Sequence, residues 1–189
     1  SVDLPRDQFA RQLLLARGDS HQIGPANFSR LVTDPRGHAE QVGRYFMGIK
    51  IQCANCHNHP FDRWTQEDYH GLASMFARLD RGRVVQDLNR GLVTNPKTKE
   101  PAFPKIPGDA DLTESKNPIA DFADWLLHRK NPIYPQVVVN RLWYSMMGKG
   151  LVEPFDDFRN TNPPSHPKLL ERLAEEFVEG EYRIKPILR

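Results

Sequence analysis

The stretch that determines the organisation of this chain is Cys53-Ala54-Asn55-Cys56-His57-Asn58-His59. It contains the only two cysteines of the sequence, separated by two residues, and a histidine follows the second cysteine directly. Cys-x-x-Cys-His is the pattern of covalent haem c attachment, in which both thiols form thioethers with the porphyrin and the imidazole ligates the iron. The pattern therefore predicts Cys53 and Cys56 as haem-binding residues and His57 as the proximal iron ligand.

The same stretch has a second interpretation as a zinc site. Cys53, Cys56 and His59, with His57 or Asp62 as a further ligand, offer thiolate, imidazole and carboxylate groups at spacings that zinc accepts. A third interpretation is a plain disulfide or a pair of unoccupied thiols. We expect haem c as the cofactor and keep zinc as the alternative.

The distal side of such a haem has only weak candidates. Met75 is one, although it lies beside an apolar helical stripe in which core packing is the simpler role for a methionine. His59 is too close to His57 to reach the opposite haem face, so we assign it a supporting hydrogen bond or a place in the alternative zinc site. The candidates for an aromatic wall around the porphyrin are Phe61, Trp64 and Tyr69. Core packing is an equally good interpretation of these three rings.

Several other side chains have simpler interpretations. His70 follows the motif on a helix but not on its apolar face, so we expect it to be solvated. Lys50 and Arg63 are candidates for pairing with haem propionates, although most such charges are only solvated. Met146 and Met147 lie at the end of a core helix, where we expect them to fill gaps.

The composition is that of a globular protein. Of the 189 residues, 39% are hydrophobic and 26% are charged, a balance that supplies enough apolar surface for a core. The formal net charge of +2 gives no electrostatic reason to expect a nucleic-acid partner. No apolar run approaches the ~20 residues that a membrane-spanning helix needs, so we expect no membrane span in this chain.

Hydrophobic periodicity and capping residues predict a mainly α fold, an irregular helical bundle with long loops. We expect helices over residues 5–16, 36–47, 65–79, 118–130, 131–147 and 165–180. Thr65 and Asp68 form a candidate capping box at the start of the third helix. Short alternations at 83–85 and 91–93 favour one small β-hairpin. The cytochrome c-like attachment motif then lies between the second and third helices.

The chain divides into three parts. We expect a helical subdomain over 1–80 that carries the Cys-x-x-Cys-His motif, an irregular linker or hairpin over 81–117, and a second helical subdomain over 118–189 that is truncated at its C-terminus. The middle part is rich in helix-breaking proline and glycine, and so long a span without periodicity indicates a boundary. The chain opens with Ser1-Val2-Asp3 and stops at Ile187-Leu188-Arg189 inside what looks like a beginning helix, so we expect it to be a piece of a longer protein, in which the absence of a targeting signal means little.

Two blocks of the sequence resemble a known family. The first is VGRYFMGIKIQCANCHNHPFDRWTQ (42–66), and the second combines NRLW (140–143), GKGLVEP (148–154) and DDFRNTNPPS (156–165). Both are similar to the large secreted cytochrome-like proteins of planctomycetes and related bacteria. This chain resembles the end of their planctomycete cytochrome domain and the start of the conserved domain of unknown function that follows it.

The resemblance implies secretion to the periplasm or another extracytoplasmic location, and it suggests haem c and its iron. We therefore expect an electron-transfer or structural redox subunit of a larger complex rather than an enzyme, with other redox proteins or subunits as partners. The alternative is a non-redox structural or interaction module with a Cys/His zinc site.

The second block contains a dense set of opposite charges. Its members are Arg141, Glu153, Asp156, Asp157 and Arg159. A hydrolase site built on Asp156 or Asp157 would need perturbed pKa values and a cleft. The preferred interpretation is a structural ion-pair network that braces the loop against the helix containing residues 140–143.

Overall fold

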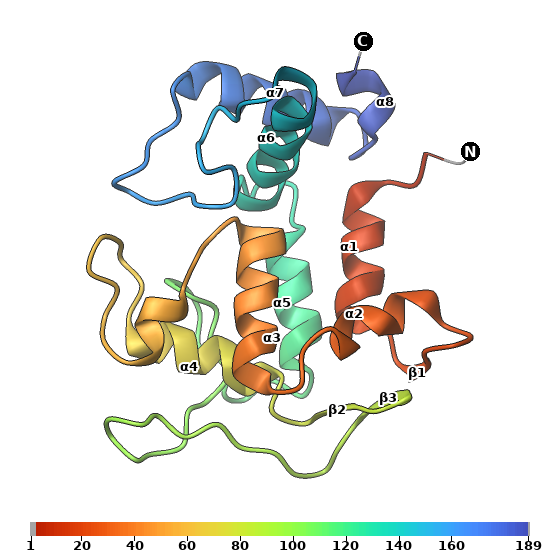
Figure 1. Cartoon of the computed structure of the whole chain (residues 1–189). Coiled ribbons are helices and arrows are strands. Elements are labelled where there is room, and N and C mark those ends of the chain that lie inside the picture. The colour runs from red at the N-terminus through yellow and green to blue at the C-terminus, as the bar shows by residue number, and fades with distance from the viewer. Residues whose placement is uncertain (1–2, 189) are drawn as a thin grey trace.

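The fold is mainly α-helical with one small antiparallel sheet, as Figure 1 shows for the computed structural model, which describes residues 3–188. The α-helices are α1 (Arg6–Leu15), α2 (Asn27–Arg30), α3 (Pro35–Val42), α4 (Gln66–Met75), α5 (Pro118–Leu126), α6 (Ile133–Met147), α7 (Pro167–Glu179) and α8 (Ile184–Ile187). The other helical turns are the 3-10 helices η1 (Gly24–Ala26) and η3 (Gln52–Asn55) and the π-helix η2 (Gly43–Met47). The strands are β1 (Gly18–Asp19), β2 (Leu79–Arg81) and β3 (Val84–Asp87). The prediction of a mainly α fold is confirmed.

Polar side chains cap the first turns of three helices. Asp34 accepts hydrogen bonds from the backbone of the first turn of α3, and Asn117 accepts one from Ala120 N in α5. The predicted capping box is present at α4, where Thr65 and Asp68 satisfy each other's backbone amides. Helix α4 nevertheless ends at Met75 rather than near residue 79, because the chain then leaves the helix to form β2.

The observed sheet differs from the β-hairpin that the sequence predicted. The strand order is β1-β3-β2, and both pairs are antiparallel. The predicted strand near residues 83–85 is confirmed, but the prediction that it pairs with a second strand at 91–93 is wrong. The backbone at Gly91 instead approaches the backbone of Ala77 so closely that a Cβ atom would collide with the Ala77 carbonyl. Only glycine fits this contact, so residues 91–93 pass Ala77 as a loop.

The sequence predicted an irregular linker or hairpin over 81–117; in the structure β2 and β3 occupy residues up to 87, and residues 88–117, all of which the structure describes, are irregular. They contain two isolated bridges, Thr94 with Pro101 and Lys105 with Asp111, and no helix or longer strand. The segment packs on α4, since Lys105 N donates to Gly71 O at 3.3 Å.

One hydrophobic core joins the early and late helices. Its buried side chains range from Ala10 in α1 to Tyr182 after α7. Helix α3 packs on α4, α1 on α5, and α6 on both α7 and η2. In Figure 1, α6, α7 and α8 lie together at the upper end of the molecule. Within residues 3–188, no helix has the length and hydropathy that crossing a membrane requires.

Candidate functional site

The Cys-x-x-Cys-His motif forms a tight helical turn. Ala54 N donates to Ile51 O at 2.9 Å, and the amides of Cys56 and His57 both lie 3.4 Å from Cys53 O. The turn begins as the 3-10 helix η3, in which residues three apart lie on the same side. Both cysteines are free and exposed. Each thiol is therefore accessible from solvent.

The hydrogen bond of His57 determines its tautomer. Its Nδ1 lies 2.8 Å from the carbonyl oxygen of Asn58. A carbonyl oxygen only accepts, so Nδ1 of the neutral ring carries the hydrogen and Nε2 keeps a free lone pair. This is the arrangement by which proteins prepare a histidine for metal ligation through Nε2. His57 is also exposed, so that nitrogen is accessible.

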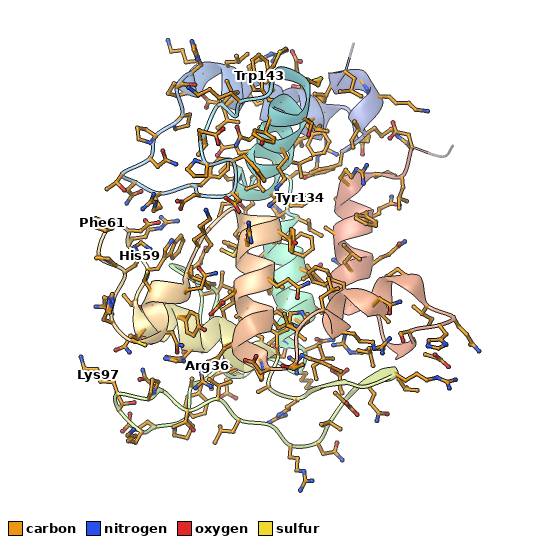
Figure 2. The ribbon with its side chains drawn as sticks, viewed as in Figure 1. Arg36, His59, Phe61, Lys97, Tyr134 and Trp143 are labelled. Carbon is orange, nitrogen blue, oxygen red and sulfur yellow. The ribbon has the colours of Figure 1, made fainter. Side chains whose placement is uncertain are left out.

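His59 has the opposite tautomer. Its Nδ1 accepts a hydrogen bond from Phe61 N at 3.2 Å, and its own backbone amide donates to Trp64 O at 2.8 Å. In the neutral ring the hydrogen is then on Nε2, which is not available as a ligand without loss or transfer of that hydrogen. Figure 2 shows His59 and Phe61 together on the loop that leads into α4. His59 therefore stabilises this loop in the described structure.

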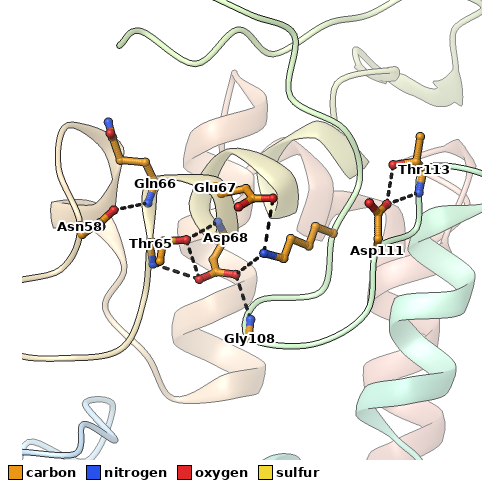
Figure 3. Close-up of polar contacts among 9 residues, drawn as sticks. Asn58, Thr65, Gln66, Glu67, Asp68, Gly108, Asp111 and Thr113 are labelled. Carbon is orange, nitrogen blue, oxygen red and sulfur yellow. Dashed lines mark hydrogen bonds and ion pairs between the residues drawn. The ribbon is translucent and has the colours of Figure 1, made fainter. Parts of the chain in front are cut away.

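Two side chains of helix α4 donate hydrogen bonds to the carbonyl group of Asn55, which lies between the two cysteines. His70 Nε2 lies 3.1 Å from Asn55 O, and Gln66 Nε2 lies 3.3 Å from the same oxygen. Gln66 N also donates to Asn58 Oδ1 at 3.1 Å (Figure 3). The side chains of Gln66 and His70, one helical turn apart, thus hold Asn55 between the two cysteines, and the backbone amide of Gln66 holds Asn58 after them.

The expectation that His70 is solvated is wrong. His70 is fully buried, and its Nδ1 has no hydrogen-bond partner among residues 3–188. Burial lowers the pKa of His70, so the ring is neutral and Nε2 donates to Asn55 O. The sequence did contain a signal for this role. Gln66 and His70 are four residues apart, so they lie on the same face of α4.

Asp68 connects α4 to the irregular segment. Its Oδ1 accepts from Gly108 N at 3.0 Å and lies 3.2 Å from Lys105 Nζ, while Oδ2 accepts from Thr65 (Figure 3). Burial alone would raise the pKa of Asp68, but the hydrogen bonds from Gly108, Thr65 and Lys105 lower it. The ionised carboxylate therefore holds the 105–108 loop against the start of α4.

The three candidate wall aromatics lie in different environments. Phe61 is 62% exposed, whereas Trp64 and Tyr69 are almost completely buried. The hydroxyl of Tyr69 donates to Glu40 at 2.7 Å, and the guanidinium of Arg63 lies over the Trp64 ring at 4.6 Å. Of the three, Phe61 has the ring that an exposed ligand at the motif could reach.

The methionine candidates also differ. Met75 is part of the main buried core, as the core-packing interpretation expected. Met146 and Met147 are 47% and 59% exposed, so the expectation that they fill core gaps is wrong. The last turn of α6 extends beyond the core into solvent.

The alternative zinc ligands do not form a cluster. Across residues 3–188, no group of three histidine, cysteine, aspartate or glutamate side chains is close enough together to hold a metal ion. Two thiols and His57 lie on one turn, while His59 bonds back to its own loop. The same finding covers Cys53, Cys56 and His57, which therefore form no such group either.

The charges of the second block contact a different part of the chain from the one expected. Asp156 Oδ2 lies 2.6 Å from Arg44 Nε, and Asp156 Oδ1 lies 3.0 Å from Lys50 Nζ. Burial would raise the pKa of Asp156, but the hydrogen bonds from Lys50 and Arg44 lower it. An ion-pair network is confirmed, but its partners are residues upstream of the motif rather than the helix at 140–143. Arg141 instead donates to the carbonyls of Arg44 and Tyr45.

The helix at 140–143 stabilises the loop through Asn140. Asn140 is fully buried. Its Nδ2 donates to Val152 O and Phe155 O at 3.1 and 3.2 Å, and its Oδ1 accepts from Leu151 N and Val152 N at 2.8 and 3.0 Å. One amide therefore satisfies four backbone groups of the loop.

The fold and site define a class of helical unit with a surface Cys-x-x-Cys-His turn supported from two sides. Two family models match the chain. Residues 2–81 match PSCyt2, a protein of unknown function (DUF1549) whose name denotes a planctomycete cytochrome-like domain, and residues 120–189 match PSD1, a protein of unknown function (DUF1553). These matches support the domain arrangement that the two sequence blocks implied. No curated protein and no solved structure matches the chain.

Proposed function

We propose that this chain binds one haem c through Cys53 and Cys56 and serves electron transfer or a structural redox role in a larger extracytoplasmic protein. The observation that carries the proposal is the combination of two free, exposed thiols on one turn with an adjacent imidazole whose Nε2 is free. The cytochrome-like name of the matched PSCyt2 model supports the same cofactor.

Different residues would have different roles in haem binding. Each thiol would add across one porphyrin vinyl group, with the sulfur bonding to one carbon and the hydrogen going to the other, so no net oxidation occurs. His57 would ligate the iron through Nε2, while its Nδ1–H bond to Asn58 O keeps the ring oriented. A bound haem supplies one-electron redox chemistry. His70 and Gln66 hold the Asn55 carbonyl and so fix the turn between the two sulfurs.

A zinc-binding interaction module is the competing function. It would recruit Cys53, Cys56 and His59, but His59 Nδ1 accepts from Phe61 N and the ring then presents a protonated Nε2. Zinc binding through His59 Nε2 would therefore require this ring to change its tautomer and give up its hydrogen bond from Phe61 N, whereas the haem proposal requires no change at His59. This difference favours haem. Redox proteins or other subunits are the proposed partners, in the periplasm or another extracytoplasmic compartment.

The test is production of the chain in a host that attaches haem to Cys-x-x-Cys-His sequences. We expect a pyridine haemochrome spectrum of haem c and an intact mass that shows one haem adduct on Cys53 and Cys56. The double variant Cys53→Ser/Cys56→Ser should be colourless and carry no adduct. A colourless wild-type protein of unmodified mass with one zinc ion per chain would select the zinc module instead.

A further inference from the structure

The loop over residues 153–165, which belongs to the second matched segment, contacts the chain just before the motif. Phe158 N donates to Gly48 O at 2.7 Å. Asp156 adds ion pairs to Arg44 at 2.6 Å and to Lys50 at 3.0 Å. These three partners span the end of η2 and the approach to Cys53. The loop therefore fixes the part of the chain that directly precedes the Cys53–His57 turn.

The same loop also contacts the chain just after the motif. The hydroxyl of Thr161 donates to Phe61 O at 3.2 Å. Gly48 precedes the Cys-x-x-Cys-His turn in the sequence, and Phe61 follows it. The carbonyl groups of both residues accept hydrogen bonds from the 153–165 loop. A segment that is more than 90 residues away in sequence thus holds both ends of the turn.

The loop packs closely against the backbone at Gly48. Gly48 has φ +65°, and a Cβ atom built there would lie 2.7 Å from side-chain atoms of both Phe158 and Val137. Asn140 of α6 makes one hydrogen bond to Phe155 O within the loop and three to Leu151 and Val152 directly before it. Residues 155–158 of the loop are therefore held between Gly48 and α6.

Two adjacent aspartates of the loop have different partners. Asp156 and Asp157 are both buried, with 3% and 5% of their surface exposed. Asp156 uses both oxygens on cations of the first matched segment, whereas Asp157 pairs with Arg159 of its own loop at 2.9 Å. Burying a carboxylate is costly unless it is paired. The pairing of Asp156 stabilises only the arrangement in which the two segments are docked.

We infer that Asp156 is a positioning residue for the Cys53–His57 turn and that the 153–165 loop of the second segment completes the cofactor site of the first. The loop would determine where the two thiols and the His57 imidazole stand relative to each other. The consequence for a bound haem rests on the proposed function, but the positioning of the turn does not.

The first experiment uses the haem-free chain and compares Asp156→Asn with Asp157→Asn. Native-state hydrogen exchange should accelerate about tenfold for the amides of Ala54, His57 and His59 in Asp156→Asn. The labelling rates of the two thiols should change several-fold at the same time. Exchange in α7 should stay at the wild-type rate, and Asp157→Asn should leave the motif amides unchanged. Equal acceleration in both variants, or acceleration spread over the whole chain, would overturn the inference in favour of a general stabilising role.

A second pair of variants covers the case in which Asp156→Asn does not fold. Thr161 is exposed, so Thr161→Val removes only the hydroxyl bond to Phe61 O, and Thr161→Ser restores a donor. We expect faster exchange around residues 59–61 in Thr161→Val and recovery in Thr161→Ser. Wild-type exchange rates in both variants would contradict the role of the loop.

The haem-loaded protein supplies a separate readout. If wild type carries haem, Asp156→Asn should shift its reduction potential or its absorption spectrum, while Asp157→Asn should not. If wild type carries no haem, the proposed function fails, and the exchange and labelling results still decide the positioning role by themselves.

Discussion

His70 supports the Cys-x-x-Cys-His turn, with its Nε2 3.1 Å from the carbonyl oxygen of Asn55 between the two cysteines. The imidazole is fully buried and neutral, so it acts as a hydrogen-bond donor of fixed direction. Since Gln66 Nε2 donates to the same oxygen, the backbone between the thiols is held by two side chains of α4.

The first prediction concerns the removal of this donor. His70→Leu should lower the free energy of unfolding by about 1–2 kcal/mol, because Asn55 O loses one of its two side-chain donors in a buried environment. Urea titration followed by circular dichroism measures the change. His21 is exposed, so His21→Leu is the matched control and should stay within about 0.5 kcal/mol of wild type. Equal stability of His70→Leu and wild type would contradict the role given to His70.

The second prediction is a pH dependence that arises from His38. Burial, together with the charges of Arg81 and Arg17, lowers the pKa of His38 from 6.5 to about 3. In the unfolded chain His38 therefore binds a proton below pH 6.5, whereas in the folded chain it stays neutral down to about pH 3. Stability is then full above pH 6.5 and falls as the pH drops through this window, by up to about 1.4 kcal/mol per pH unit.

His38→Leu provides the check on this sign. His38 stacks on Phe76 with ring centroids 4.3 Å apart, so an apolar replacement keeps a packed core. The variant should have a flatter stability curve between pH 6.5 and pH 4, measured by urea titration at each pH. Below pH 4 both proteins should lose stability, because Asp68 and Asp156 have lowered pKa values and must then be protonated. An unchanged slope in His38→Leu would show that another group controls this range.

The local part of the fold could be predicted from the sequence because its signals lie within a few residues. The Thr65–Asp68 capping box and the Asn117 cap both start helices where the sequence indicated. The motif itself was recognisable because its chemistry depends on adjacent residues. The structure adds the tautomers of His57 and His59, which depend on the carbonyl and amide that each ring meets.

The remaining features depend on contacts between distant residues. Asp156 and Arg44 are 112 positions apart, and no periodicity or spacing indicates their pairing. The same holds for β1, which joins the sheet through Gly18 and Val85. The charged residues of the second block predicted an ion-pair network but not its partners. The sequence does not indicate which distant segment a charged side chain will contact in the fold.

The third prediction tests Asn140. Asn140→Leu should lower the free energy of unfolding by about 3–5 kcal/mol, because four backbone groups of the 151–155 segment lose their partner in a buried site. Ser145→Ala on the same helix removes an exposed hydroxyl that bonds only to Arg141 O, so it should change stability by less than about 0.5 kcal/mol. Thermal and urea unfolding of the two variants make the comparison. A small effect in Asn140→Leu would mean that the loop finds other donors and acceptors.

The fourth prediction separates backbone strain from crowding at Gly48. Gly48 and Gly148 both have positive φ, +65° and +73°, but a Cβ atom meets Phe158 and Val137 at Gly48 and nothing within 4 Å at Gly148. Gly148→Ala should therefore cost about 1 kcal/mol from the left-handed backbone alone. Gly48→Ala should cost about 2–4 kcal/mol, since the crowding adds to that strain. Equal costs would indicate that Phe158 moves aside freely, which would also weaken the case that the 153–165 loop is held at Gly48.

The last prediction distinguishes the two histidines of the motif. His57 has a free Nε2 because Nδ1 donates to Asn58 O, whereas His59 accepts from Phe61 N through Nδ1. In a haem-loaded protein, His57→Ala should therefore change the absorption spectrum of the iron, and added imidazole should restore it by filling the vacated ligand position. His59→Ala should keep the wild-type spectrum and lose only about 1 kcal/mol of stability, because one hydrogen bond in the 59–64 loop is removed. A zinc site would reverse the order: His59→Ala would then release the metal, as elemental analysis would show, and no haem spectrum would exist to compare. Loss of the iron spectrum in His59→Ala but not in His57→Ala would contradict the assignment of His57 as the proximal ligand.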